Sequence, residues 1–214
     1  MRTHSLSFLA ITASLFSFTS AQAEASPKTF EQWCQQKNSL SDGAKNTVEA
    51  LLKEADTQDC KDASKKLTSL SELSITFGNI TDLEPLSSLT NLTSLYLVES
   101  GSEGTEKTEI KDIKHLSKLT KLTELALWSN KVTDLKPLGK LTSLTFLDLQ
   151  DNEISDIKSL STLTKLEYLN LSRNPITTLK PLSSLKSLTS LSLSPTKFKP
   201  TDCPVKPTSI CFFE

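Results

Sequence analysis

The most regular feature of the chain is a pattern of leucines, L-x-x-L-x-x-L-x-L, that repeats with a fixed period. Successive copies start 22 residues apart, except for one step of 30, so one copy carries eight extra residues. Such a period predicts a solenoid in which each copy forms one coil and the leucines build a shared core. The first leucines of the five full copies and the partial sixth are Leu67, Leu89, Leu119, Leu141, Leu163 and Leu185.

Each copy combines a short strand with a buried asparagine. In the copy that begins at Leu119, we expect Leu122, Leu125 and Leu127 to point inward. The segment around Leu125 is then a strand whose other residues face the opposite side. An asparagine follows at the same place in three consecutive copies, where its amide can satisfy turn backbone between coils. These residues are Asn130, Asn152 and Asn174.

A second polar column predicts short helical turns on the convex back of the coils. An aspartate or threonine at its start can accept hydrogen bonds from free backbone N–H groups, and a proline three residues later suits the first helical turn. Because the acids come one per coil, we interpret them as caps rather than as a catalytic or metal site. The column contains Asp82, Asp112, Asp134, Asp156 and Thr178, and the prolines are Pro85, Pro137 and Pro181, with His115 in the same column.

The full pattern, L-x-x-L-x-x-L-x-L-x-x-N-x-I-x-D-L-x-P-L-x-x, resembles the 22-residue class of leucine-rich repeats found in bacterial internalins. The resemblance covers residues 67–198 and implies an α/β solenoid. In this horseshoe a parallel β-sheet lines the concave face and short helical turns line the convex face. Internalins bind host proteins through the concave face. The final segment, TDCPVKPTSIC, is similar to C-terminal caps of secreted bacterial proteins of this type.

The sequences on either side of the repeats predict two caps. Residues 24–66 form a helical N-terminal cap, since Val48, Leu51, Leu52 and Ala55 lie on one helix face. Ser41 or Asp42 is expected to cap this helix. The cap covers leucines of the first coil that water would otherwise reach, and Phe30 and Trp33 are expected to pack inside it. Residues 199–214 form the C-terminal cap.

The four cysteines fall in these two caps, and the chain therefore predicts two disulfides. Four cysteines allow three pairings. Stacked repeats would hold the two ends of the solenoid farther apart than the roughly 7 Å between Cα atoms that a disulfide tolerates. Only Cys34–Cys60 and Cys203–Cys211 satisfy this limit. The same separation excludes a metal site built from all four cysteines.

The first residues favour export. Arg2, the apolar stretch 6–18 and Ala21-Gln22-Ala23 predict a signal peptide over residues 1–23, cleaved after Ala23. The apolar stretch is shorter than the roughly 20 residues of a membrane span, so we expect a secreted or periplasmic protein without stable membrane insertion. Cleavage would leave 23 basic and 25 acidic residues. This near-neutral balance gives no reason to expect nucleic-acid binding.

Aromatic residues gather on the expected concave face. Five of the six aromatics in residues 67–198 fall at its solvent-facing positions, and acids with one arginine flank them. Aromatic and arginine enrichment is typical of binding hot spots. The alternative is that these aromatics only stabilise an exposed sheet. The candidate ligand-binding residues are Phe77, Tyr96, Trp128, Phe146 and Tyr168, with Glu124, Asp148, Asp151 and Arg173.

We therefore expect a module that binds a protein or peptide ligand. A carbohydrate-binding surface and a self-associating envelope protein are the alternatives. The inserted residues 100–108, SGSEGTEKT, predict a flexible loop beside the aromatic positions that either contacts ligand or is a tolerated insertion. No cofactor, metal or enzymatic activity is expected. His115 is assigned to the convex back, and the chain has no glycine-rich phosphate loop.

Overall fold

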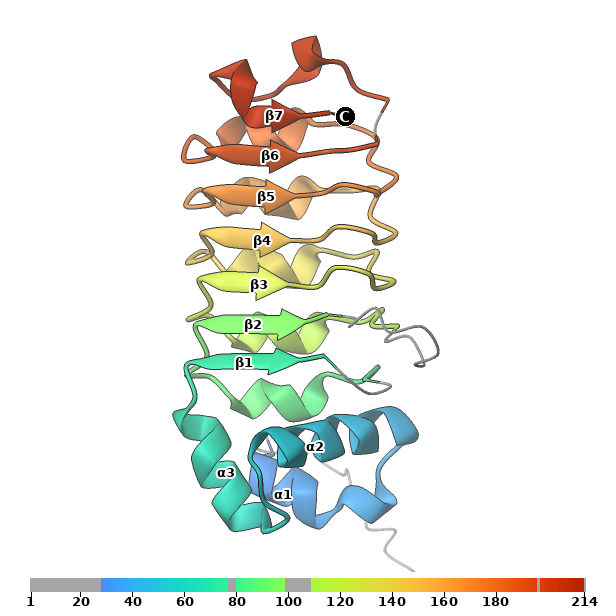
Figure 1. The fold of residues 1–214 in the computed structure, drawn as a ribbon, viewed down its shortest axis with the longest axis vertical. Helices are drawn as coiled ribbons and strands as arrows, with labels where there is room; N and C mark the ends of the chain where they lie inside the picture. Colours follow the sequence, from blue (N-terminus) through green and yellow to red (C-terminus); the bar gives the residue numbers. More distant parts are fainter. Residues whose placement is uncertain (1–27, 77–79, 99–108, 196, 214) are drawn as a thin grey trace, which may run out of the picture.

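The computed structural model describes residues 28–76, 80–98, 109–195 and 197–213. Three helices at the start are followed by coils that each contain a strand and a short helical turn (Figure 1). The expected signal peptide, Phe77 and the inserted loop 100–108 lie outside the described residues. Within them, no helix is long and apolar enough to cross a membrane.

The strands form one parallel sheet of seven, in the order in which they occur along the chain (Figure 1). The sheet shows the predicted leucine-rich repeat solenoid, with one strand per coil. A seventh strand, which the repeat pattern did not predict, comes from the C-terminal cap. The strands are β1 (Glu72–Ile75), β2 (Ser94–Leu97), β3 (Glu124–Ala126), β4 (Phe146–Asp148), β5 (Tyr168–Asn170), β6 (Ser190–Ser192) and β7 (Cys211–Phe212).

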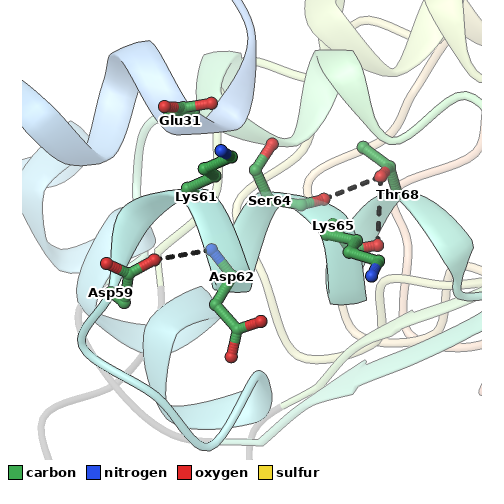
Figure 2. Close-up of a pocket in the computed structure, with 7 residues that line it drawn as sticks. All are labelled: Glu31, Asp59, Lys61, Asp62, Ser64, Lys65 and Thr68. Atoms are coloured by element: carbon green, nitrogen blue, oxygen red, sulfur yellow. Dashed lines mark hydrogen bonds between the residues drawn. The ribbon is translucent and has the colours of Figure 1, made fainter.

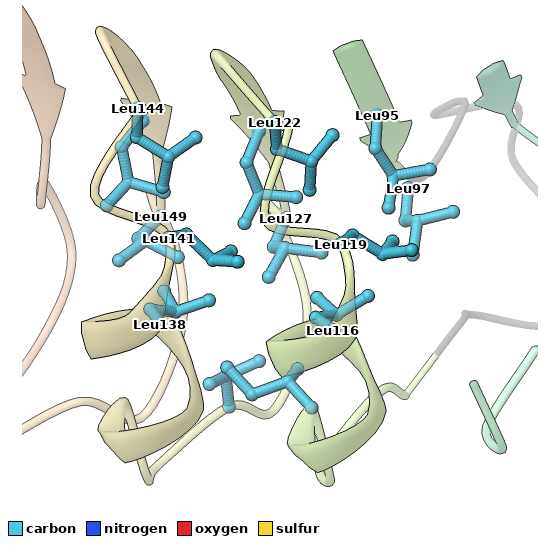
Figure 3. Packing of buried hydrophobic residues seen from close by; sticks show 14 of the residues in the cluster. Leu95, Leu97, Leu116, Leu119, Leu122, Leu127, Leu138, Leu141, Leu144 and Leu149 are labelled. Carbon is cyan, nitrogen blue, oxygen red and sulfur yellow. The ribbon is translucent and has the colours of Figure 1, made fainter. Parts of the chain in front are cut away.

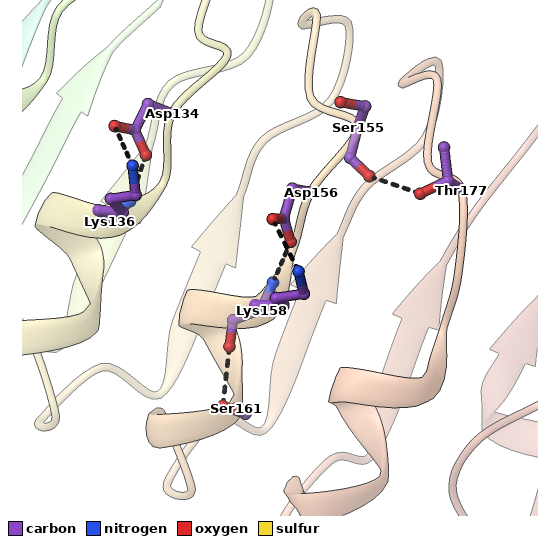
Figure 4. Close-up of polar contacts among 7 residues, drawn as sticks. All are labelled: Asp134, Lys136, Ser155, Asp156, Lys158, Ser161 and Thr177. Carbon is purple, nitrogen blue, oxygen red and sulfur yellow. Dashed lines mark hydrogen bonds and ion pairs between the residues drawn. The ribbon is translucent and has the colours of Figure 1, made fainter.

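Behind the sheet, each coil returns through a short 3₁₀ turn, as the polar column predicted. In each of the first four turns, an aspartate carboxylate accepts a hydrogen bond from the backbone N–H two residues later, such as Asp134 from Lys136 at 2.9 Å (Figure 4). Thr178 does the same at 3.3 Å in the fifth turn. The turns are η2 (Glu84–Ser88), η3 (Lys114–Lys118), η4 (Lys136–Lys140), η5 (Lys158–Thr162) and η6 (Lys180–Ser184).

The core is a continuous stack of leucines between the sheet and the turns (Figure 3). Leu122, Leu125 and Leu127 of one coil are fully buried, as the pattern predicted. Leu122 and Leu127 lie beside the equivalent leucines of the next coil, Leu144 and Leu149 (Figure 3). Leu125 is the register partner of Leu147. Full burial of one such side chain contributes about 1.5–3 kcal/mol, so the repeated column stabilises the solenoid along its whole length.

The asparagine column forms the expected ladder, with Asn130 and Asn152 buried and Asn174 half-buried. The Asn152 amide N–H group donates to the carbonyls of Leu127 and Leu149 at 2.9 and 3.1 Å. Its side-chain oxygen accepts the backbone N–H of Val132 at 3.0 Å. Asn130 and Asn174 make the equivalent bonds in their own coils. Each asparagine therefore links the backbone of two adjacent coils.

The N-terminal cap consists of α1 (Phe30–Gln35), η1 (Lys37–Ser39), α2 (Asp42–Glu54) and α3 (Cys60–Ser69). Phe30 and Trp33 are buried, and Ser41 is the N-cap residue of α2. The Cys34–Cys60 disulfide joins α1 to α3 with a Cα–Cα distance of 5.5 Å. Helix α3 runs to Ser69, so the cap overlaps the first leucine of the first coil.

The C-terminal cap contains η7 (Pro200–Asp202), η8 (Thr208–Ile210) and β7. The second disulfide, Cys203–Cys211, has a Cα–Cα distance of 6.0 Å. Val205 is buried within this cap. Because β7 pairs with β6, the cap closes the core and extends the sheet by one strand.

Candidate functional site: the concave sheet face

The solvent-facing residues of the sheet form columns that run from coil to coil. One column begins with the register partners Glu72 and Ser94 on β1 and β2. Leucines alternate with these residues and point into the core, which fixes the face of every other strand residue. We call this side of the sheet the concave face. Its first column is Glu72, Ser94, Glu124, Phe146, Tyr168 and Ser190, and its second is Ser74, Tyr96, Ala126, Asp148, Asn170, Ser192 and Phe212.

The centre of the first column is an aromatic stack. Phe146 and Tyr168 are register partners on β4 and β5. Their ring centroids lie 4.6 Å apart and their planes differ by 7°. Sequence reasoning expected these rings and Trp128 to be solvent-exposed, whereas all three are half-buried. Stacking hides one face of each ring of the pair, so the remaining aromatic surface is smaller and more fixed than expected.

Tyr96 is held by a hydrogen bond across the sheet. Its hydroxyl on β2 donates to the Glu124 carboxylate on β3. This hydrogen bond to Glu124, followed by burial, raises the pKa of Tyr96 above its usual value. The phenol therefore stays protonated at neutral pH, and the bond fixes the orientation of both side chains.

Asp148 belongs to a hydrogen-bonded network in the sheet rather than to an exposed rim. Its Oδ1 accepts the backbone N–H of Gln150 at 2.9 Å. The Asn170 amide N–H group donates to Asp148 Oδ2 at 3.3 Å and to Gln150 Oε1 at 3.0 Å. Burial raises the pKa of Asp148, and the bonds from Gln150 and Asn170 oppose that rise. Burial, followed by the Asp148 charge, also raises the pKa of Tyr168.

Beyond the strands, three coils turn through a left-handed residue. Ser129, Asp151 and Arg173 have φ values of 58°, 57° and 55°, a conformation that residues other than glycine adopt infrequently. In each of these coils, the left-handed residue is followed directly by the asparagine that links adjacent coils. The Ser129 hydroxyl donates to Asp151 at 3.2 Å, whereas Asp151 and Arg173 are exposed at the edge of the concave face.

Sequence reasoning missed Phe212 as a concave-face residue. Phe212 is the register partner of Ser192 and therefore shares its face. With 55% of its surface exposed, it is the most exposed large hydrophobic residue in the part of the chain that the structure describes. The alternation of Cys211 and Phe212 was the available signal, but a two-residue strand is too short for alternation to be recognised.

Pockets elsewhere do not combine with this site. One lies beside α1 and α3 and is lined by polar and charged side chains, including Glu31, Lys61 and Lys65 (Figure 2). Asp59 at its edge accepts the backbone N–H of Asp62 at 2.8 Å and caps α3. Another pocket lies between η6 and the C-terminal cap and includes Thr178, Phe198 and Asp202. Neither contains a concave-face residue.

The fold and the strand columns define the class of protein, a leucine-rich repeat solenoid. The family model described as leucine rich repeats (2 copies) matches residues 120–164 and 142–183. No curated protein sequence matches the chain significantly. Solved structures do match, at 25–28% sequence identity.

An internalin (inlF) from Listeria monocytogenes is 27% identical, with a TM-score of 0.52 over 67% of this chain and 47% of the internalin. The chain thus matches about half the length of that protein. A leucine-rich repeat protein from Leptospira interrogans is 25% identical, with a TM-score of 0.52 over 62% of this chain and 39% of that protein. Internalin C2 (inlC2) of Listeria monocytogenes is 28% identical, with a TM-score of 0.48 over 68% and 72% of the two chains.

The two disulfides and the likeness to the internalin (inlF) suggest an extracellular protein. Disulfides form and persist mainly in oxidising compartments, and the described part of the chain contains no free cysteine. The leucine-rich repeat fold is commonly used for protein–protein interaction. The structural neighbours thus share a fold whose typical use is binding rather than catalysis.

Proposed function

We propose that the chain is an exported module that binds a protein or peptide ligand through its concave face. The observation that supports this most directly is the Phe146–Tyr168 stack at the centre of that face. The pair is half-buried and held in one orientation, and Trp128 of the adjacent coil is also half-buried. Rigid aromatic side chains provide contact area with little loss of side-chain entropy on binding.

The charges around the stack favour a particular ligand chemistry. Glu72, Glu124 and Asp151 lie on the concave face or at its edge, with Arg173 as the basic residue among the candidate site residues. A ligand that presents basic side chains beside an apolar one would complement this arrangement. Charge complementarity of this kind increases association rates and selects partners.

Export is proposed from the N-terminal pattern, with cleavage after Ala23, and the disulfides support it because they require an oxidising compartment. The proposal does not include enzymatic activity. His115, the histidine available for acid–base chemistry in the described residues, lies in η3 on the convex side. It is therefore on the opposite side of the coil from the concave face.

The experiment is a pull-down from the native envelope and culture medium with the full chain as bait. The Trp128→Ala/Tyr168→Ala variant removes aromatic surface from the concave face, and Lys136→Ala/Lys158→Ala is the matched control in the convex turns. We expect one polypeptide to be captured by the wild type and the control, and capture by the aromatic variant to fall at least tenfold.

Two outcomes would replace the proposal. Retention on polysaccharide columns that depends on Trp128 and Tyr168, without capture of a polypeptide, would indicate a carbohydrate-binding surface. Concentration-dependent dimerisation that the same variant abolishes would indicate self-association. Equal capture by the aromatic variant and the wild type would place the binding surface elsewhere on the molecule.

A further inference from the structure

The first two residues of the convex turns repeat from coil to coil, and the repeat changes chemically in the first two coils. The residue that opens each turn is lysine in four coils and glutamate in the first, at Glu84. The next residue is proline in three coils and serine in one, but histidine in η3, at His115. Glu84 lies in η2 and His115 lies in η3, and these two turns pack against each other.

These two residues converge with a third potential ligand. The side-chain oxygen or nitrogen atoms of Asp82, Glu84 and His115 all lie within 4.8 Å of one another. Asp82 Oδ1 accepts the backbone N–H of Glu84 at 2.9 Å, which fixes the orientation of the carboxylate. The second carboxylate oxygen of Asp82 is thereby left for another ligand.

The two carboxylates of this cluster are more enclosed than the same positions in other coils. Asp82, Glu84 and His115 are half-buried. The equivalents of Asp82 and Glu84 elsewhere in the solenoid are exposed, namely Asp112, Asp134 and Asp156 in the aspartate column, and Lys114, Lys136, Lys158 and Lys180 in the lysine column. The first coil thus differs from the others in both side-chain chemistry and exposure.

The N-terminal cap explains the difference in exposure. Helix α2 packs on η2, and the Thr47 hydroxyl donates to the backbone carbonyl of Asp82 at 2.7 Å. Gly43, near the start of α2, lies so close to Thr81 that any side chain there would meet the threonine hydroxyl. Two contacts from α2 therefore fix the backbone at Thr81 and Asp82.

Lys114, the basic residue beside the cluster, does not have its closest ion pair with Asp82 or Glu84. Lys114 Nζ lies 2.8 Å from Asp112 Oδ2, so its closest partner is an acid outside the cluster. The His115 imidazole therefore lies beside the carboxylates of Asp82 and Glu84, and all three side chains are half-buried. One imidazole nitrogen and two carboxylates are a ligand set that suits Zn²⁺, with a fourth position open to water.

We propose that Asp82, Glu84 and His115 form a binding site for a divalent transition-metal ion, with Zn²⁺ as the ion that fits this ligand set. A bound ion would connect the first coil to the second on the convex side, directly under the cap helix α2. It would stabilise the N-terminal end of the solenoid, since a ligand that binds only the folded state shifts unfolding toward higher temperature.

The test compares zinc binding by the full chain, without a histidine tag and after removal of metal with EDTA, with that of two reversion variants. His115→Pro and Glu84→Lys each introduce the residue that most other coils have, so both are expected to fold. Asp156→Asn removes the equivalent carboxylate two coils beyond η3 and is the matched control.

We expect the wild type and Asp156→Asn to bind one Zn²⁺ per chain by calorimetry, and both reversion variants to bind at least tenfold more weakly. Zn²⁺ should raise the Tm of the wild type but not of His115→Pro. The imidazole NMR signal that His115→Pro lacks should shift when Zn²⁺ is added. Three results would overturn the proposal: equal zinc binding by both reversion variants, no zinc-dependent shift of the imidazole signal that His115→Pro lacks, or a zinc-independent loss of Tm in His115→Pro without zinc binding by the wild type. The last result would assign the cluster to an ion pair between coils.

Discussion

The rings of Phe146 and Tyr168 stack across neighbouring strands with 4.6 Å between centroids and 7° between planes. Aromatic pairs of this kind contribute about 0.5–1.5 kcal/mol beyond the area they bury. A double-mutant cycle with Phe146→Ala, Tyr168→Ala and the double variant should therefore give a coupling of that size in the free energy of unfolding. Urea denaturation measures it. Purely additive losses would mean that the two rings are adjacent without stabilising each other.

A second prediction separates the concave aromatics from the core. Leu147 on β4 is fully buried, and its replacement by alanine should reduce the free energy of unfolding by about 2–5 kcal/mol through cavity formation. Trp128 and Tyr168 are half-buried, so Trp128→Ala/Tyr168→Ala should cost less stability for each residue removed. Denaturation curves of the two variants check this. If each aromatic replacement costs as much free energy of unfolding as Leu147→Ala, the aromatics are part of the core and the binding proposal fails.

The strand columns could be predicted because the 22-residue period allows one register. Once Leu125 and Leu147 point inward, Glu124 and Phe146 must be neighbours on the other face, as the structure shows. The same logic explains the correct prediction of the asparagine ladder. The turn backbone of successive coils has the same buried polar groups, and an asparagine stands at the same position in three consecutive copies to bond them.

Features that depend on side-chain conformation could not be predicted in this way. Alternation places Asp148 on the concave face but does not reveal that Asn170 and Gln150 enclose it. The cap helix α3 buries two apolar residues, Ala63 and Leu67, which are too few to show a helix face in the sequence. Strand β7 is two residues long and belongs to no repeat, and Phe212 was missed for that reason.

The asparagine ladder should be more sensitive to substitution than the aspartate caps. Asn152 is 6% exposed and bonds to backbone groups of two coils. Asn152→Ala leaves several buried groups without partners, each costing about 1–3 kcal/mol. Asp156 is an exposed cap, and Asp156→Ala should cost about 0.5–2 kcal/mol. Denaturation of both variants tests the ranking. An equal or smaller loss in Asn152→Ala would show that water replaces the amide.

The N-terminal disulfide should stabilise the cap. Cys34 and Cys60 are 26 residues apart in the sequence, and the chain-entropy model gives about 3.5 kcal/mol for closing a loop of that length. Cys34→Ser/Cys60→Ser should therefore lower the Tm. Hydrogen exchange should show faster opening in α1 and α3 than in the central coils. Non-reducing peptide mapping of the wild type is the control, and Cys34 linked to Cys203 or Cys211 would contradict the cap assignment.

The last prediction concerns Asp148 and pH. Burial raises the pKa of its carboxyl above the usual value of about 3.9. The folded state then holds this proton more tightly than the unfolded state does. The stability contributed by protonated Asp148 is fully present below about pH 3.9 and is lost as pH rises through the higher folded-state pKa. At neutral pH the ionised carboxylate therefore opposes folding.

In the Asp148→Asn variant, the side chain at position 148 cannot ionise. The pH-dependent contribution of Asp148 to the free energy of unfolding should therefore be absent. The free energy of unfolding of the wild type minus that of Asp148→Asn should fall as pH rises from about 3.5 through the folded-state pKa, and then level off. Urea denaturation at a series of pH values measures the difference. The control is Asp156→Asn, which replaces an exposed aspartate and shows how the free energy of unfolding changes with pH when an unburied carboxylate is removed. A difference that is constant with pH would show that the bonds from Gln150 and Asn170 balance the cost of burying the charge. A difference that increases in favour of the wild type would show that the bonds outweigh it.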